Sequence, residues 1–100
     1  MTRVLTVLEA HIPPERQDDL KAAYHEAVVD SPPPGLVRSM LVQDINDRML
    51  WRIETLWESR EALAAMRGMG TPRGVLIFRA AGAEPVPAVL DVVEELTPGT

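Results

Sequence analysis

The sequence predicts an α+β protein of the ferredoxin-like class, with one antiparallel sheet and its helices on one face. Three observations predict this class. Four stretches show the period-two alternation of strands. Helix-period patterns lie between the first and second of these stretches and between the third and fourth. A short polar segment joins the second and third stretches as a hairpin, which gives the order β-α-β-β-α-(α)-β.

The first strand is predicted over residues 3–11, where β-branched residues recur with period two. Pro13 and Pro14 end this strand, and a helix follows from Glu15. The helix must end before residues 32–35, Pro-Pro-Pro-Gly, because proline excludes the preceding residue from the α conformation. Its apolar face consists of Leu20, Ala23, Tyr24, Ala27 and Val28.

The central hairpin is predicted from a strand over residues 36–43, a turn over 44–47 and a strand over 49–57. Ser59 is a good N-cap for a second helix, and Gly68 and Gly70 fit its C-terminal end. The apolar residues of this helix are Ala62, Leu63, Ala65 and Met66.

The last third of the chain is harder to interpret. Thr71 and Pro72 fit an N-cap and a first helical position, so a short third helix ending at Gly82 is expected. Residues 75–78 also fit a buried strand, because four consecutive apolar residues have no readable period. The last strand is predicted over residues 86–96, and Pro87 favours an edge position. We expect one domain over residues 1–97 and a flexible tail over 98–100.

Composition narrows the function classes. The chain has 100 residues, of which 46% are hydrophobic and 25% charged, as in soluble globular proteins. It has no cysteine, so disulfides, thiolate nucleophiles and zinc–thiolate sites are excluded. The net charge of −5 repels nucleic acid and anionic membranes. No apolar run is long enough to span a membrane and no signal peptide is evident, so a cytoplasmic protein is expected.

The predicted strands carry large apolar residues on both faces. Leu5 and Val7 lie behind Val4 and Leu8 in the first strand, and the third and fourth strands show the same pattern. Two or three helices can cover only one face of the sheet, so the other face would form a large exposed apolar patch. A second copy of the same sheet is the simplest cover, which predicts a homodimer.

Two segments resemble the antibiotic biosynthesis monooxygenase superfamily, also called dimeric α/β-barrel proteins. They are residues 54–63, Glu-Thr-Leu-Trp-Glu-Ser-Arg-Glu-Ala-Leu, and residues 78–85 before the last strand; Pro34-Gly35-Leu36 adds to the likeness. The resemblance implies two ferredoxin-like subunits packed sheet to sheet, each with a pocket between its sheet and helices. Some members oxidise polycyclic phenols with dioxygen and neither metal nor flavin, some oxidise quinols, and some degrade haem.

The sequence differs from these members at two sets of positions that matter for their reactions. The haem degraders combine an Asn, a Trp and a late His ligand; Trp57 matches the Trp, but His11 and His25 both lie early in the chain. The phenol oxidisers place an Asn four residues before this Trp and a Tyr six residues after it. Here those positions are the apolar Ile53 and Leu63. Because a late histidine and all cysteines are absent, we expect no cofactor and no bound metal.

Four residues are candidates for the site, each with a structural alternative. Trp57 either stacks on a flat ligand or belongs to the core. Arg79 either stabilises a phenolate, enolate or superoxide anion or covers apolar surface with its stem. Tyr24 either orients a substrate oxygen or packs in the core. His11, which shares a strand face with Glu9, is either a general base or a rim residue.

The resemblance implies a cofactor-independent monooxygenase, an oxidoreductase that acts on a small aromatic substrate such as a polycyclic phenol or quinol. The alternative is a non-enzymatic homodimer of the same fold that binds a small molecule or has a structural role. An RNA-recognition domain shares the topology, but the acidic charge and the lack of aromatic residues for a sheet surface exclude it.

Overall fold

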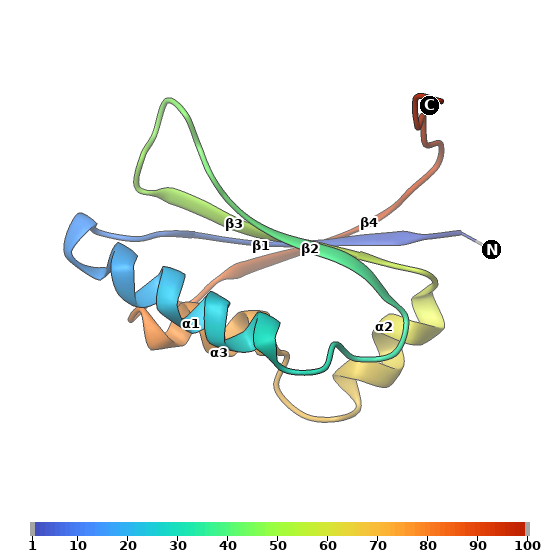
Figure 1. The fold of residues 1–100 in the computed structure, drawn as a ribbon, viewed down its shortest axis with the longest axis horizontal. Helices are drawn as coiled ribbons and strands as arrows, with labels where there is room; N and C mark the ends of the chain where they lie inside the picture. The colour runs from blue at the N-terminus through green and yellow to red at the C-terminus, as the bar shows by residue number, and fades with distance from the viewer. Residues whose placement is uncertain (1, 100) are drawn as a thin grey trace.

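A four-stranded antiparallel sheet with helices on one face forms the fold, as the sequence predicts (Figure 1). The computed structural model describes residues 2–99. The strands lie in the order β2-β3-β1-β4. Along the chain the elements are β1 (Val4–His11), a 3-10 turn (Pro14–Arg16), α1 (Gln17–Val29), β2 (Leu36–Gln43), β3 (Leu50–Trp57), α2 (Arg60–Arg67), α3 (Arg73–Ala80) and β4 (Val86–Asp91).

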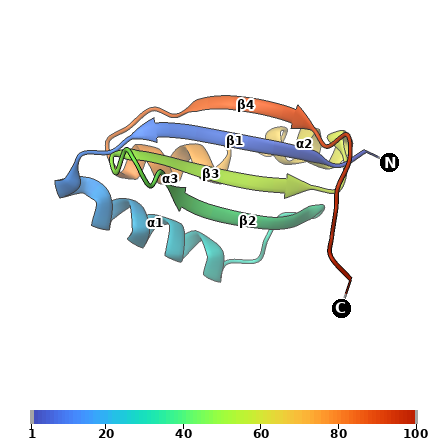
Figure 2. The same ribbon diagram turned by 90° about the horizontal axis from the view of Figure 1, so that it is seen from above.

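The helices cover the sheet in two groups, each above its own apolar cluster. α1 and α3 lie side by side over one half of the sheet, and α2 lies over the other half (Figures 1 and 2). The cluster under α1 and α3 is built around Leu20, Trp51, Ile53, Ile77 and Phe78. The cluster under α2 contains Val4, Trp57 and Leu63. No helix within residues 2–99 has both the length and the apolar character that a membrane crossing requires.

Residues 75–78 lie in a helix, so the strand alternative is wrong. α3 begins at Arg73, and the main-chain oxygen of Pro72 accepts hydrogen bonds from the amides of Val75 and Leu76. Pro72 therefore occupies the N-cap position, which the sequence assigned to Thr71. The helix ends at Ala80, and Gly82 follows with φ of 78°, a left-handed conformation that glycine adopts without strain.

The last strand is shorter than the predicted range of residues 86–96. β4 ends at Asp91, which pairs with Val4 at the start of β1. One more main-chain hydrogen bond follows, from the amide of Val92 to the main-chain oxygen of Arg3. The chain beyond this point rises on the side of the sheet away from the helices (Figure 1). The edge position that Pro87 favours is confirmed.

Gly35 brings the start of β2 close to α2. Its φ is 85°, and its main-chain oxygen accepts a hydrogen bond from the amide of Glu58. A Cβ atom at this position would lie 2.4 Å from the Cβ atom of Ala62. Glycine is therefore required here both for the backbone conformation and for the close approach of the two segments.

We predict that Gly35→Ala lowers the free energy of unfolding by about 2–4 kcal/mol, because left-handed strain and overpacking both act at this site. Gly70→Ala is the matched control, since Gly70 has φ of 120° but no atom within 4 Å of an added Cβ. This control should show the strain alone, about 1–2 kcal/mol. Urea unfolding measures both values, and equal losses would contradict the packing argument.

Candidate functional site

The helix α2 places one face toward the edge strand β4. Ser59 begins the helix, and its Oγ accepts a hydrogen bond from the amide of Ala62 at 3.1 Å, which confirms the predicted N-cap. Side chains at positions i, i+3, i+4 and i+7 lie on one face of a helix. In α2 these positions hold Arg60, Leu63, Ala64 and Arg67.

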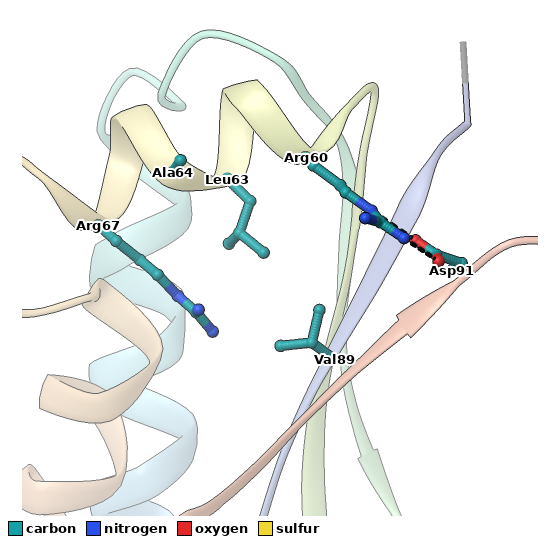
Figure 3. A pocket seen from close by; sticks show the side chains of 6 residues that line it. All are labelled: Arg60, Leu63, Ala64, Arg67, Val89 and Asp91. Carbon is teal, nitrogen blue, oxygen red and sulfur yellow. Dashed lines mark hydrogen bonds and ion pairs between the residues drawn. The ribbon is translucent and has the colours of Figure 1, made fainter.

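An open pocket of about 550 Å³ lies between this helix face and β4. From β4, Val89 and Asp91 complete its lining. Val89 pairs with Thr6 of β1 and Asp91 with Val4, which is buried under the helices, so both residues lie on the helix side of the sheet. Figure 3 shows Leu63 and Val89 facing each other across the pocket, with Arg67 at one end and Arg60 at the other.

The two arginines of the pocket differ in their partners. Arg60 donates two hydrogen bonds to the carboxylate of Asp91, one of them from Nε to Oδ1 at 3.0 Å. These hydrogen bonds lower the pKa of Asp91 below its ordinary value and raise that of Arg60. Arg67 makes no ion pair with any residue of the range 2–99. The pocket therefore has one neutralised cation and one that is available to a ligand.

Trp57 lies next to the pocket rather than in its lining. Its side chain is 3% exposed and packs in the same cluster as Leu63. The indole Nε1 donates a hydrogen bond to Thr6 Oγ1 at 3.1 Å. The bond holds the indole of β3 to Thr6 of β1, and Thr6 is the cross-strand neighbour of the pocket residue Val89.

A row of hydroxyl groups crosses the helix side of the sheet between the two apolar clusters. Tyr24 donates from its hydroxyl to Ser39 Oγ at 3.1 Å, and Ser39 Oγ lies 3.1 Å from Thr55 Oγ1. Thr6 Oγ1 donates to the main-chain oxygen of Thr55 at 3.3 Å. The sequence analysis missed Ser39, Thr55 and Thr6 as site-forming residues. The available signal was a hydroxyl residue at an inward position of each of three neighbouring strands.

The structure does not bring Tyr24, Trp57 and Arg79 together around the pocket. Tyr24 lies on α1, where it packs against the other apolar cluster. Arg79 is exposed near the end of α3, and its Nε donates to Glu84 at 2.9 Å. The hydrogen bonds and charge of Glu84 raise the pKa of Arg79 above its ordinary value.

The predicted pair of His11 and Glu9 does not form. Glu9 accepts two hydrogen bonds from Arg52, which lies directly opposite it on β3. His11 Nε2 lies 3.0 Å from Asp47 Oδ2 in the hairpin turn. Glu9 pairs with Arg52 rather than with His11, because directly opposed residues on neighbouring strands are closer than residues i and i+2 on one strand.

His11 and Glu9 belong to a second hollow, of about 500 Å³, at the other end of β1. The loop between α3 and β4 forms its remaining wall, and Glu84 adds another carboxylate. Among residues 2–99, no group of three or more histidine, aspartate or glutamate side chains is arranged to hold a metal ion.

The family model for antibiotic biosynthesis monooxygenases matches residues 3–70 of the chain. Among solved structures, SnoaB from Streptomyces nogalater, a cofactor-independent oxygenase, is 14% identical with a TM-score of 0.71, and the match covers 99% of this chain and 100% of SnoaB. A haem-degrading protein from Mycobacterium tuberculosis is 20% identical with a TM-score of 0.72, over 97% and 98% of the two chains.

A candidate antibiotic biosynthesis monooxygenase from Caulobacter crescentus is 21% identical with a TM-score of 0.71, over 93% of this chain and 92% of that protein. At these identities the structural likeness shows a common fold. A search of curated proteins gave no significant match. The family match includes β1 and all of α2, and therefore most of the pocket, whereas β4 lies outside it.

We predict that Thr6→Val lowers the free energy of unfolding by about 1–3 kcal/mol, because it leaves the buried indole N–H of Trp57 without an acceptor. In a Trp57→Phe background the same change should cost much less, since no indole N–H remains. A double-mutant cycle by urea unfolding measures the coupling between the two residues. Equal costs of Thr6→Val in the two backgrounds would show that the bond does not hold Trp57.

Proposed function

Because the chain belongs to the antibiotic biosynthesis monooxygenase family, we propose that it is an oxygenase that acts without a cofactor on a small, flat, hydroxylated aromatic or quinol-like molecule. One observation carries the proposal. The α2–β4 pocket combines two facing apolar side chains, Leu63 and Val89, with the cation of Arg67, which forms no ion pair within residues 2–99. Such a site suits an aromatic ring that becomes an anion during the reaction.

The proposed reaction needs no external reductant. An activated CH₂ group of an anthrone-like phenol loses a proton, and the resulting anion transfers one electron to dioxygen. The two radicals combine to a peroxide anion, which takes back one proton from water to become a hydroperoxide. The hydroperoxide then loses water and leaves a carbonyl group. One dioxygen molecule is consumed, with one oxygen atom in the product and the other in water. All electrons come from the substrate.

The residues of the pocket have separate tasks in this reaction. Leu63 and Val89 hold the ring by removing apolar surface from water. Arg67 favours the anionic form of the substrate, since a nearby cation lowers the pKa of a phenol or enol. The carboxylate of Asp91 is already bonded to Arg60, so it is not available as a base. The proton therefore leaves to water through the open side of the pocket.

The four residues expected from the sequence enter this proposal differently. Trp57 supports the pocket from behind Leu63 by its packing and its bond to Thr6. Arg79, Tyr24 and His11 do not line the pocket, and their roles in catalysis stay predictions. Variants of Arg79 and Arg67 compared in one assay decide which cation stabilises the anion.

Haem does not fit the residues of this pocket. An axial imidazole ligand would have to come from His11 or His25. His11 is bonded to Asp47 beside the second hollow, and His25 is exposed on α1. The lining of the α2–β4 pocket includes neither histidine. Neither histidine therefore lies where it could ligate haem in this pocket.

We predict oxygen consumption with 1,8-dihydroxyanthrone as the probe substrate, measured with an oxygen electrode together with incorporation of labelled dioxygen into the ketone. Val89→Phe should lower the rate by about tenfold or more, because the phenyl ring of the variant occupies the space that the substrate needs. Val28→Phe is the control, since Val28 is as exposed as Val89 but lies on α1. The control should keep both the rate and the melting temperature.

Two outcomes would contradict the proposal. If neither anthrone-like phenols nor quinols raise oxygen consumption above background, the alternative of a small-molecule-binding protein replaces it. If Arg79→Ala removes activity while Arg67→Gln does not, the charge-stabilising group lies on α3, and the α2–β4 pocket is not the reaction site. Both variants change exposed residues, so loss of folding should not confuse the comparison.

We also propose that the chain acts as a homodimer joined through the open face of the sheet. Figure 2 shows this face with no helix in front of it. On β4, Leu90 lies on this face because it pairs with Leu5, and it is 49% exposed. Apolar residues extend over the other strands of the same face, among them Val7, Met40, Val42, Leu50 and Val86.

We predict a mass of about twice 11.0 kDa by light scattering at low micromolar concentration. Leu90→Arg should weaken the dimer by about 100-fold or more, because the charge would be buried without a partner. Val28→Arg, on the helix side, should leave the dimer intact. A soluble wild-type monomer, or a Leu90→Arg protein that stays dimeric, would disprove this arrangement.

A further inference from the structure

The lining of the α2–β4 pocket has the opposite charge to the chain as a whole. The chain carries a net charge of −5, whereas the charged residues of the lining are two arginines and one aspartate. The ion pair of Arg60 and Asp91 is neutral by itself. The remaining positive charge belongs to Arg67, which forms no ion pair within residues 2–99.

We propose that this pocket selects aromatic molecules that carry a carboxylate, and that Arg67 binds this carboxylate. The proposal rests on the proposed function for the place of the substrate and adds the substrate's chemical class. A guanidinium group presents two parallel N–H donors that match the two oxygens of a carboxylate. The ring then lies against Leu63 and Val89, the apolar residues between the two ends of the pocket (Figure 3).

Charge balance favours a single carboxylate over a phosphate. One uncompensated cation neutralises a monoanion, whereas a phosphate dianion would leave a negative charge against apolar residues and near Asp91. The same charge balance sets the orientation of the ligand. Because Arg60 is already neutralised by Asp91 at its end of the pocket, a ligand carboxylate is attracted to the Arg67 end (Figure 3). The uncharged part of the ring system faces the ion pair.

The test compares 2-naphthoate with 2-naphthamide, which have the same shape and differ in charge. Titration calorimetry on the wild type should show tighter binding of 2-naphthoate by about five- to tenfold, a modest factor because Arg67 is exposed. Arg67→Gln should remove this preference, because 2-naphthoate loses its charged partner and 2-naphthamide does not. Arg73→Gln, an exposed arginine on α3 outside the pocket lining, should keep the preference.

A second variant tests the charge balance in the opposite direction. Asp91→Asn removes the negative charge of the lining and releases Arg60, so the affinity for 2-naphthoate should rise by several-fold while that for 2-naphthamide stays constant. Raising the salt concentration should weaken 2-naphthoate binding and leave the amide unaffected. Equal affinities for the two probes, no binding of either, or a preference that survives Arg67→Gln would overturn the proposal.

These measurements use no oxygen, so they separate the two proposals. If 2-naphthoate binds through Arg67 and no substrate consumes oxygen, the selectivity stands and the oxygenase function fails. If anthrone-like phenols consume oxygen and Arg67→Gln has no effect on the preference between the probes, the oxygenase function stands and the carboxylate selectivity fails.

Discussion

The register between β1 and β3 determines which side chains face the helices. These two strands form the centre of the sheet, with Val4 opposite Trp57 and His11 opposite Leu50. A slip of one residue would exchange the two faces of a strand. The apolar pattern alone gives little protection against such a slip, because both faces of the sheet carry large apolar residues. Two polar pairs favour the observed register over a slipped one. Thr6 accepts a hydrogen bond from Trp57 on the helix side, and Glu9 accepts one from Arg52 on the open side.

Local sequence signals predict the bounds of an element where a single strong signal, such as a proline run or an N-cap, is present. The proline run and the Ser59 cap placed the boundaries of α1 and α2, and the alternation placed the strands. Signals failed where the deciding partner was distant in sequence. The apolar residues 75–78 have no period of their own, and packing against the sheet makes them a helix. The end of β4 depends on where β1 begins, which composition near residue 91 does not reveal.

The candidate site was predicted less well for a related reason. Arg79 and His11 were chosen by chemical type, but each has a partner that only the fold brings near: Glu84 from the next loop and Asp47 from the hairpin turn. Arg67 was overlooked because it looks like an ordinary residue in the last turn of a helix. Its importance comes from β4, which places Val89 opposite Leu63 and so completes the pocket at whose end Arg67 lies.

The helix that carries the site cannot be stable alone. α2 has eight residues, fewer than an isolated helix needs in water. Its position therefore depends on three contacts: the Ser59 cap, the close approach of Gly35 to Ala62, and the burial of Leu63 against Trp57. The Arg60–Asp91 ion pair adds a fourth link, but it is exposed and contributes little to stability by itself. A ligand that fills the pocket touches α2 and β4 together, so its binding energy stabilises the contact that the exposed ion pair holds only weakly.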